Sequence, residues 1–282
     1  MFINRFKNRP APLATIFICV LCFTLIYGCL PNSQPTAEAS TLLTEPFLQL
    51  PTENSVRVAW FTEFPGEQNT VAYGENLKQA TDATTIKLSH TREDQKSRVG
   101  NQSKNKQVYQ KPTQRDIWRH EAEVTGLTPG KEVKYQVISK AENGGESKSK
   151  IYNLASTPQP GKPLKILLTS DHQLKPMTAA NLQKAEEIGD IDAVFMAGDL
   201  INISDRASEW FDDNRGGAFF PAFQGKANYQ IDKDGVKTTY TGGEIIQEAP
   251  LFTAIGNHEV MGRRGKSDDL GGEYNDAIPR AV

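Results

Sequence analysis

The sequence predicts a chain of two domains, an all-β sandwich followed by a layered α/β domain. Three observations support this. Short segments between residues 45 and 157 alternate apolar and polar side chains, which is typical of antiparallel strands. From about residue 163 the pattern changes to short continuous apolar runs with a helix-forming segment between them. The length of 282 residues is enough for about two domains.

The composition narrows the class of protein. Hydrophobic residues make up 38% of the chain and the formal net charge is −2. These values argue against a disordered chain, and no nucleic-acid binding is predicted from so small a charge. All three cysteines, Cys19, Cys22 and Cys29, lie in the first 29 residues. Both domains are therefore expected to fold without disulfides or a cysteine-based zinc site.

Residues 1–29 have the layout of a secretory signal. Arg5, Lys7 and Arg9 precede a segment without charges from Ala11 to Gly28, and Cys29 follows it. The stretch IYGC also resembles a bacterial lipobox, which implies cleavage before Cys29 and lipidation of that residue, although Tyr27 stands where a small residue is usual. An uncleaved anchor is the alternative, because about 18 apolar residues are just enough to span a bilayer.

Either interpretation predicts an exported protein. The expected location is the periplasm or the cell surface, and lipidation of Cys29 would make the chain an outer-membrane lipoprotein held to the membrane by its N-terminal lipid. Residues 30–44 are rich in Pro, Ser, Thr and Ala and show no apolar period. We interpret them as a linker.

The sandwich is predicted from segments such as Ser55 to Phe64, where Val56, Val58 and Trp60 alternate with polar or small residues. Leu127 and Tyr135 stand in the order of a tyrosine corner, in which the Tyr hydroxyl bonds to backbone upstream. Residues 45–157 therefore resemble a fibronectin type III-like domain. The stretch EPFLQLPTENSVRVAWFTE is also similar to the start of the N-terminal domain of purple acid phosphatases. A sandwich without a catalytic role of its own is the favoured interpretation.

A polar segment from His90 to Asp116 interrupts this domain. Its lysines and arginines could attract phosphate polymers, but a solvated long loop explains them as well and is favoured. His90 and His120 have no metal-ligand spacing around them and are predicted to be surface residues.

The α/β domain is predicted from three apolar runs, Leu164 to Ser170, Ile191 to Gly198 and Leu251 to Gly256. Such runs suit parallel strands that are covered on both faces. Between the first two runs, Leu182, Ala185 and Ile188 recur at helical spacing, with Thr178 as the expected cap and Gly189 as the end. A βαβ unit therefore begins near residue 163.

Each apolar run is followed by polar residues, in SDHQ, GDLIN and GNHE. Ligands of open α/β sheets bind outside the carboxyl ends of the strands. Carboxylate and amide oxygens such as those of Asp171, Asp199 and Asn257 are hard ligands, and one carboxylate can bridge two metal ions roughly 3.5–4 Å apart. His258, next to Asn257 in sequence, is a candidate proton donor.

These three stretches resemble the first three motifs of the metallophosphoesterase superfamily, the calcineurin-like and purple acid phosphatase group. The resemblance implies a layered α/β/β/α-type domain, of which residues 163–282 would be the N-terminal part. It also implies two divalent or trivalent ions, Fe, Mn or Zn, and a phosphate-ester substrate hydrolysed by metal-activated hydroxide. By this resemblance Asp171 would bind the first ion, Asp199 would bridge both, and Asn257 would bind the second. His258 would be the acid or the transition-state stabiliser.

The sequence departs from the family pattern in three places. Gln173, a weaker ligand, stands where the family has a histidine, and His172 is beside it. Asn202 stands where purple acid phosphatases have the tyrosine that gives their iron its colour. No histidine follows His258, although the family has ligands in later motifs such as GHxH. We interpret the chain as a fragment or truncated copy of a longer enzyme, which leaves its own activity open.

Two alternatives remain at this stage. The segment from Ser208 to Pro250 carries aromatic residues that could line a substrate cleft, although local packing under a loop is the favoured interpretation. For the whole chain, the alternative to an exported phosphoesterase is a lipid-tethered binding or adhesion module with a degenerate phosphoesterase remnant. The substrate, the metal and the oligomeric state cannot be read from the sequence.

Overall fold

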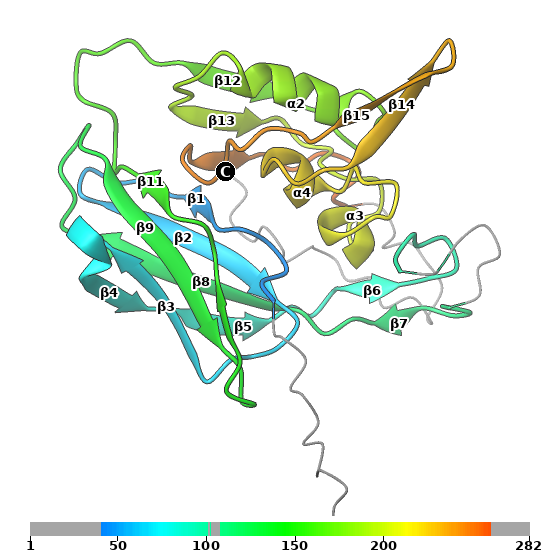
Figure 1. Cartoon of the computed structure of the whole chain (residues 1–282), viewed down its shortest axis with the longest axis horizontal. Coiled ribbons are helices and arrows are strands. Elements are labelled where there is room, and N and C mark those ends of the chain that lie inside the picture. The colour runs from blue at the N-terminus through cyan, green and yellow to red at the C-terminus, as the bar shows by residue number, and fades with distance from the viewer. Residues whose placement is uncertain (1–40, 101, 103–107, 261–282) are drawn as a thin grey trace, which may run out of the picture. The chain divides into compact units, whose positions relative to one another are not determined.

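The computed structural model describes residues 41–100, 102 and 108–260, and Figure 1 shows the arrangement of the elements. The predicted signal, the lipidation site Cys29, most of the linker and the segment after Val260 lie outside these residues. The described residues belong to a single compact unit. In the described part of the chain, no helix has the length and apolar character needed to cross a membrane.

The N-terminal half contains two antiparallel sheets, as predicted. The first sheet has the order β1-β2-β8-β5, and the second has the order β10-β9-β3-β4 with β11 also pairing with β9. Their strands are β1 (Phe47–Gln49), β2 (Ser55–Thr62), β3 (Gln68–Tyr73), β4 (Gln79–Asp82), β5 (Thr84–Lys87), β8 (Trp118–Thr125), β9 (Val133–Lys140), β10 (Glu146–Lys148) and β11 (Tyr152–Leu154). A short 3₁₀ helix, η2 (Glu75–Leu77), follows β3.

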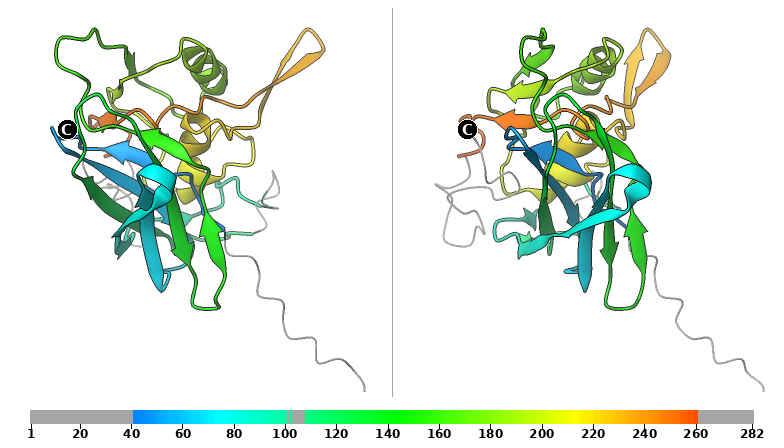
Figure 2. Two further views of the ribbon diagram at one scale, coloured as in Figure 1. Left: turned by 60° about the vertical axis from the view of Figure 1, so that its left-hand side comes forward. Right: turned by 90° about the vertical axis from the view of Figure 1, so that its left-hand side faces the viewer.

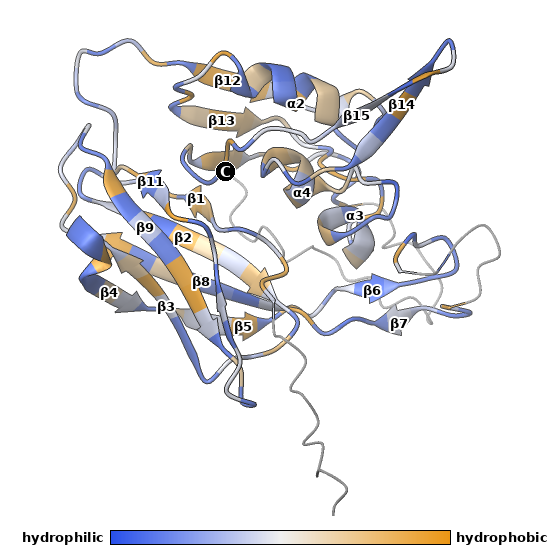
Figure 3. Cartoon of the chain, viewed as in Figure 1, coloured by the Kyte–Doolittle hydropathy of each residue, from blue (hydrophilic) through white to orange (hydrophobic). Residues whose placement is uncertain are grey.

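The core of the sandwich is formed by alternate residues of the two sheets. Hydrophobic and hydrophilic residues alternate along β9 in Figure 3, and its Tyr135 and Val137 pack with Val58 and Trp60 of β2. The other side of β2 is buried too, because Ala59 and Phe61 belong to a second core that is shared with the C-terminal half. Strand β2 thus lies between two hydrophobic cores.

The tyrosine-corner prediction is wrong about the hydrogen-bond partner of the Tyr135 hydroxyl. The Tyr135 hydroxyl donates to the backbone carbonyl of Gln247 at 2.5 Å, so its partner lies downstream in the C-terminal half. Tyr135 is fully buried, and this burial raises the pKa of its hydroxyl well above the usual value. The bond therefore ties the sandwich to the segment that precedes β16 (Leu251–Thr253).

The prediction that His120 lies on the surface is also wrong. Its side chain is completely buried, with Nε2 2.7 Å from the Thr62 hydroxyl and Nδ1 2.9 Å from the Thr85 hydroxyl. Because the Thr62 hydroxyl donates to the carbonyl of Phe64, it must accept from His120, which places the ring proton on Nε2. His90, in contrast, is partly exposed, as predicted.

The polar segment after His90 is not the solvated loop that was predicted. It contains the short hairpin of β6 (Arg92–Glu93) and β7 (Thr113–Gln114), and both residues of β6 are buried. Arg92 pairs with Asp205 at 2.6 Å, and Arg115 forms a two-bonded pair with Asp212. Eight charged residues join this segment to the C-terminal half, and we call them the buried ion-pair cluster: Arg92, Glu93, Asp94, Arg115, Asp205, Arg206, Glu209 and Asp212.

The C-terminal half contains the predicted βαβ unit and the third strand. Strands β12 (Ile166–Thr169), β13 (Ala193–Met196) and β16 form a parallel sheet in the order β12-β13-β16. Helix α2 (Thr178–Glu186) connects β12 to β13 and buries Leu182 and Ala185, while Gly189 follows it with a φ of 67°. Thr178 does not cap the helix as predicted, because its hydroxyl donates to the His172 carbonyl and Met177 occupies the cap position.

In the described part of the chain the sheet is covered on one face, which corrects the prediction that both faces are buried. Val194, Met196 and Leu251 belong to the hydrophobic core. On the other face Leu168 is 73% exposed and Phe195 is 41% exposed. Among the described residues, nothing covers this second face to the same extent.

Two short helices and a hairpin fill the segment between β13 and β16. They are α3 (Ala207–Phe211), α4 (Phe219–Phe223), β14 (Tyr229–Lys233) and β15 (Val236–Tyr240). The hairpin turns through Asp234 and Gly235, both at positive φ, as a two-residue loop requires, and it projects from the rest of the chain in Figures 1 and 2.

The aromatic residues of this segment form a core and do not line a cleft. Five of them are nearly inaccessible to solvent, namely Trp210, Phe211, Phe219, Phe220 and Phe223, while Tyr229 and Tyr240 are partly buried. Phe220 packs on Phe47 at a ring-centroid distance of 5.2 Å, so the packing extends into the sandwich and is not local.

Candidate metal and phosphate site

The three parallel strands end level with one another, which brings their polar residues to one edge. Thr169 of β12 pairs in register with Met196 of β13, and Met196 pairs with Thr253 of β16. The chain then continues within a few residues to Asp171, Asp199 and Asn257 respectively. The predicted site residues are therefore placed on three adjacent loops at the carboxyl edge of the sheet.

Asp199 is the centre of the site. Its Oδ1 accepts a hydrogen bond from the backbone amide of His258 at 3.0 Å, and its Oδ2 accepts one from the Gln173 side-chain amide at 3.1 Å. The three predicted residues thus meet directly, although they come from three different loops. Each Asp199 oxygen keeps a second lone pair, because each accepts one of these bonds.

Asn202 closes a ring of hydrogen bonds around Asp199. Its side-chain amide donates to the Gln173 carbonyl at 2.8 Å, and its own carbonyl accepts from His258 Nδ1 at 2.8 Å. A carbonyl can only accept, so the ring proton of His258 lies on Nδ1. The Nε2 atom of His258 is therefore the ring nitrogen that is available to a ligand.

Glu259 binds the loops together. Its Oε2 accepts from the backbone amides of Asp199 at 2.9 Å and Gly256 at 2.7 Å, and its Oε1 accepts from the amide of Leu200 at 2.8 Å. The side chain is buried. It satisfies amides that would otherwise be left without partners at the ends of β13 and β16.

Gly198 and Gly256 are required by the close approach of these two loops. A Cβ on Gly256 would lie 2.1 Å from Asp199 Oδ1, and a Cβ on Gly198 would lie 2.6 Å from the Gly256 amide nitrogen. Asp199 itself has a φ of 57°, in the left-handed region that side chains seldom adopt. Strained backbone of this kind is frequent at functional sites.

Asp171 and Asn257 lie beside this ring and are both exposed. The Asp171 amide donates to the Gly198 carbonyl at 3.3 Å, so the first loop is joined to the second, and Asp171 also has a positive φ of 56°. Asn257 lies between Gly256 and His258, whose amides bind Glu259 and Asp199. Both residues are therefore on loops whose backbone is fixed.

His172 is turned into the protein and is not placed as a ligand. Its Nε2 is 2.8 Å from the Thr169 hydroxyl, and its ring stacks on Phe223 at 4.9 Å. Burial, together with a smaller effect of the Lys175 charge, lowers the pKa of His172 to about 4. This histidine is a packed core residue.

The candidate residues carry the kinds of oxygen atom that bind a hard cation. Asp171, Asp199 and Asn257 offer two carboxylates and an amide oxygen, the ligands such cations prefer. Gln173 turns its amide nitrogen toward Asp199, so its predicted role as a weak oxygen ligand is not the role it has here. Within the described ranges, no three His, Cys, Asp or Glu side chains lie close enough to hold an ion. These residues would hold part of a coordination sphere.

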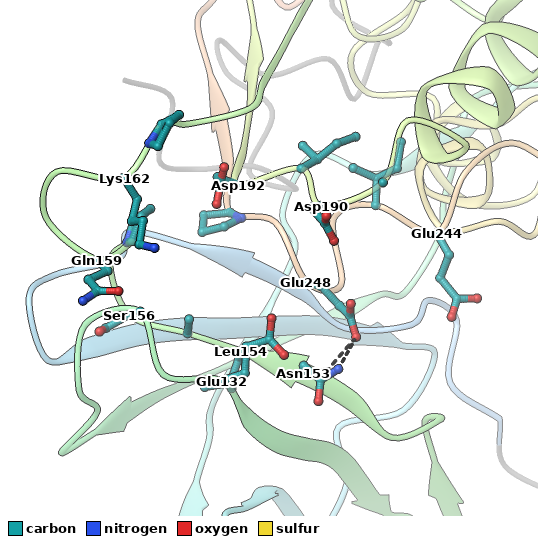
Figure 4. Close-up of a pocket in the computed structure, with 18 of the residues that line it drawn as sticks. Glu132, Asn153, Leu154, Ser156, Gln159, Lys162, Asp190, Asp192, Glu244 and Glu248 are labelled. Atoms are coloured by element: carbon teal, nitrogen blue, oxygen red, sulfur yellow. Dashed lines mark hydrogen bonds between the residues drawn. The ribbon is translucent and has the colours of Figure 1, made fainter.

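A cavity of about 490 Å³ lies elsewhere, at the amino ends of the same strands. Its lining includes Asp190 and Asp192 before β13 and Pro250 before β16. In Figure 4 the Asn153 side chain is bonded to Glu248 at one side of this cavity, at a distance of 3.2 Å. Because ligands of open α/β sheets bind at the carboxyl edge, this cavity does not belong to the candidate site.

Comparison with known proteins shows that the first half of the chain is similar to a known family. Residues 44–155 match the family model of the purple acid phosphatase N-terminal domain. The match covers the sandwich and ends before β12, so it concerns the domain that precedes the candidate site and not the site itself. No curated protein matches the chain.

Solved structures show which fold the chain shares. A purple acid phosphatase from yellow lupin (Lupinus luteus) seeds aligns with 81% of this chain at 20% identity, with a TM-score of 0.51. The aligned part is 38% of the lupin enzyme, so this chain spans well under half of that protein. At this identity the likeness concerns the fold alone. The aligned share of this chain is larger than the segment that the family model matches.

Two further structures align only weakly. A cycloalternan-degrading enzyme from Trueperella pyogenes is 12% identical over 42% of this chain and 16% of its own, with a TM-score of 0.26. A family 28 exopolygalacturonase from Yersinia enterocolitica is 15% identical over 54% of this chain and 27% of its own, with a TM-score of 0.24. Neither score bears on the fold or on the site.

Sequence reasoning missed two residues that organise the site, Glu259 and Asn202. Glu259 is the last letter of GNHE, and its place in that motif was the available signal. Asn202 was noted only as a departure from the tyrosine of purple acid phosphatases. No sequence signal showed that its carbonyl would accept from His258, because backbone acceptors carry no residue preference.

Proposed function

We propose that this chain belongs to an exported, metal-dependent phosphoesterase that hydrolyses phosphate esters. The observation that carries the proposal is the ring formed by Asp199, Gln173, Asn202 and His258 at the carboxyl edge of a parallel sheet. The phosphoesterase assignment is supported by its position directly after residues 44–155, which match the family model of the purple acid phosphatase N-terminal domain. Export rests on residues 1–29 and membrane attachment on lipidation of Cys29.

In this proposal each site residue has a separate role. Asp171 and Asn257 would each bind one ion, and Asp199 would bridge the two. Bound Fe, Mn or Zn ions would lower the pKa of a water nucleophile and neutralise phosphate charge. His258, held through Nδ1 by Asn202, would present Nε2 to the phosphoryl or leaving oxygen. Glu259 and the two glycines keep the loops at the required separation.

The test is hydrolysis of a generic aryl phosphate by the purified chain with manganese, zinc or iron. We expect turnover with at least one metal, and its loss to background in Asp199→Ala. Asp190→Ala is a matched control, because Asp190 also has a positive φ, of 47°, and flanks β13 at its other end. Its turnover should be unchanged.

A folded chain that gives no turnover with any of the three metals would contradict the proposal for this chain. That result would favour the alternative, a lipid-tethered binding or adhesion module in which the sandwich is the functional part. Equal loss in Asp199→Ala and Asp190→Ala would also contradict it, because it would indicate damage to β13 and not to the site.

A further inference from the structure

The peptide group between Asn202 and Ile203 joins the candidate catalytic histidine to a buried carboxylate. On one side, its carbonyl accepts from His258 Nδ1 at 2.8 Å. On the other side, its N–H, which belongs to Ile203, donates to Glu209 Oε2 at 3.0 Å. The C=O and N–H of a trans peptide point in opposite directions, so Glu209 and His258 face each other across one planar group.

Glu209 holds more than this one peptide. The same Oε2 atom accepts from the Asn202 amide at 2.8 Å, so one oxygen fixes two consecutive amides. The side chain of Asn202 is held separately by the Gln173 carbonyl. The peptide that orients His258 is therefore restrained at both of its ends.

Glu209 is itself fixed by the buried ion-pair cluster. It is 4% exposed, and its Oε1 accepts from Arg206 Nη1 at 2.6 Å. Arg206 Nη2 donates to both Asp94 oxygens, at 2.9 and 3.2 Å, and Arg92 donates to Asp94 at 2.6 Å. Burial alone would raise the pKa of Asp94, but the Arg206 charge and hydrogen bonds outweigh it and lower the pKa below its usual range. The charges that hold Glu209 thus extend to the β6 hairpin of the sandwich half.

We propose that Glu209 is a positioning residue that acts on His258 through the Asn202–Ile203 peptide, fixing its ring orientation and its Nδ1–H tautomer. The catalytic consequence rests on the proposed phosphoesterase function; the effect on the ring does not. An anionic oxygen at the N–H end of a buried peptide polarises it and strengthens its carbonyl as an acceptor. Hydrogen bonds with one ionised partner are also roughly twice as strong as neutral ones.

The direct test is the tautomer of each histidine by long-range ¹H–¹⁵N NMR at about pH 9, above the ordinary imidazole range. Only four histidines are present, which makes the spectrum tractable. We expect His258 to be the Nδ1–H tautomer and His120 to be the Nε2–H tautomer. His120 is therefore an internal reference for the opposite tautomer. An Nε2–H signal for His258 in the unsubstituted protein would overturn the proposal.

The variant test compares Glu209→Gln with Glu93→Gln. A glutamine at 209 is uncharged, and its amide nitrogen would face either Arg206 or the two backbone amides, donor against donor, so the restraint on the peptide should weaken. Glu93 is a matched control, because it is fully buried in the same cluster and accepts from Ser208 and Arg115, but does not touch Asn202 or Ile203. We expect an additional Nε2–H signal of His258 in Glu209→Gln and none in Glu93→Gln.

Activity gives a second readout where the chain turns over substrate. Loss of a hydrogen-bond partner behind a site residue typically costs about 10-fold in activity. We expect this loss in kcat for Glu209→Gln with KM unchanged, and a smaller change for Glu93→Gln. Equal effects of both variants on the tautomer and on kcat would overturn the proposal, because they would show a general role in folding.

The two proposals can fail separately. A chain without turnover in which Glu209→Gln still changes the His258 tautomer would contradict the phosphoesterase proposal and support the positioning role. If Glu209→Gln does not fold, an Nε2–H signal of His258 in the unsubstituted protein would still overturn the proposal. A turnover that is lost in Asp199→Ala but unaffected in Glu209→Gln would leave the phosphoesterase in place and overturn the positioning role.

Discussion

His120 lies in the strand WRHEAEVT on the same face as Ala122 and Val124, which is the apolar face of the alternation. The structure buries that face, and two threonine hydroxyls from β2 and β5 satisfy both ring nitrogens. Burial disfavours the charged imidazolium and lowers the pKa of His120 to about 4. The alternation is compatible with this burial, but the two hydrogen bonds could not be predicted from the sequence, because neither threonine is near His120 along the chain.

This burial predicts a loss of stability in acid. The unfolded chain binds a proton at the ordinary histidine pKa of 6.5, whereas the folded chain binds it only near 4. Between these values the unfolded state holds more protons, so the free energy of unfolding falls as the pH falls from about 6.5 toward 4. One pKa unit is worth 1.36 kcal/mol, so we expect His120 to contribute a drop of about 2 kcal/mol between pH 7 and pH 5.

Urea unfolding of the unsubstituted chain and of His120→Gln at both pH values measures this contribution. His172 also has a pKa lowered to about 4 and contributes in both proteins, so only the difference between the two drops reports on His120. The same drop in both proteins would contradict the buried, neutral state of His120.

The residues of the candidate site were only partly predictable from the sequence. Asp171, Asp199, Asn257 and His258 could be named from three short motifs, because each follows an apolar strand. Glu209 could not be named, since it lies in a short helix of aromatic and charged residues that indicates only packing. Its role depends on a contact with two backbone amides, and such contacts leave no pattern in the sequence.

At the scale of elements, the strands were predicted and their surroundings were not. The apolar runs that became β12, β13 and β16 are continuous, so they show that strands form but not which face is covered. The apolar runs predict that Leu168 and Phe195 are core residues, but both are exposed in the structure. The close approach of the loops at Gly198 and Gly256, which end two of these runs, was likewise not predicted and is seen only in the structure.

Gly256→Ala tests this approach. The φ of Gly256 is outside the left-handed region, so alanine is acceptable to the backbone and the cost is steric: the new Cβ would lie 2.1 Å from Asp199 Oδ1. Overpacking of this kind costs about 1–3 kcal/mol. We expect that destabilisation in urea unfolding, together with a shift of the His258 amide resonance, because that amide donates to Asp199 Oδ1.

Gly144→Ala is the control for this variant. Gly144 has a φ of 80° and open space around it, so alanine there should cost about 1–2 kcal/mol through the backbone alone. The His258 amide should not move. If Gly256→Ala also left that amide in place, the contact between the loops of β13 and β16 would not have the geometry described.

At the scale of the whole molecule, the two halves share a hydrophobic core. Phe61 of β2 packs on Phe211 at 5.0 Å and on Phe220 at 5.2 Å, and no sequence period indicates that a sandwich strand is buried on both sides. The Tyr135 bond to Gln247 and the buried ion-pair cluster add polar contacts between the same halves. Two domains that looked separable in sequence are therefore joined by apolar and charged contacts.

This shared core predicts that the described part of the chain unfolds in one cooperative transition. Phe61→Ala should cost about 3–5 kcal/mol, since it removes a fully buried ring from the junction. Val71→Ala is the matched variant, because Val71 is equally buried but belongs only to the sandwich core.

Hydrogen exchange of the amides in β9 and β13, followed through urea unfolding, reports on the two halves separately. If they unfold together, Val71→Ala must lower the midpoint of β13 as much as that of β9, although Val71 does not belong to the core that contains β13. A Val71→Ala protein in which β13 keeps its midpoint while β9 loses its own would show that the halves are energetically independent domains, and Phe61 would then be a contact between them and not part of a common core.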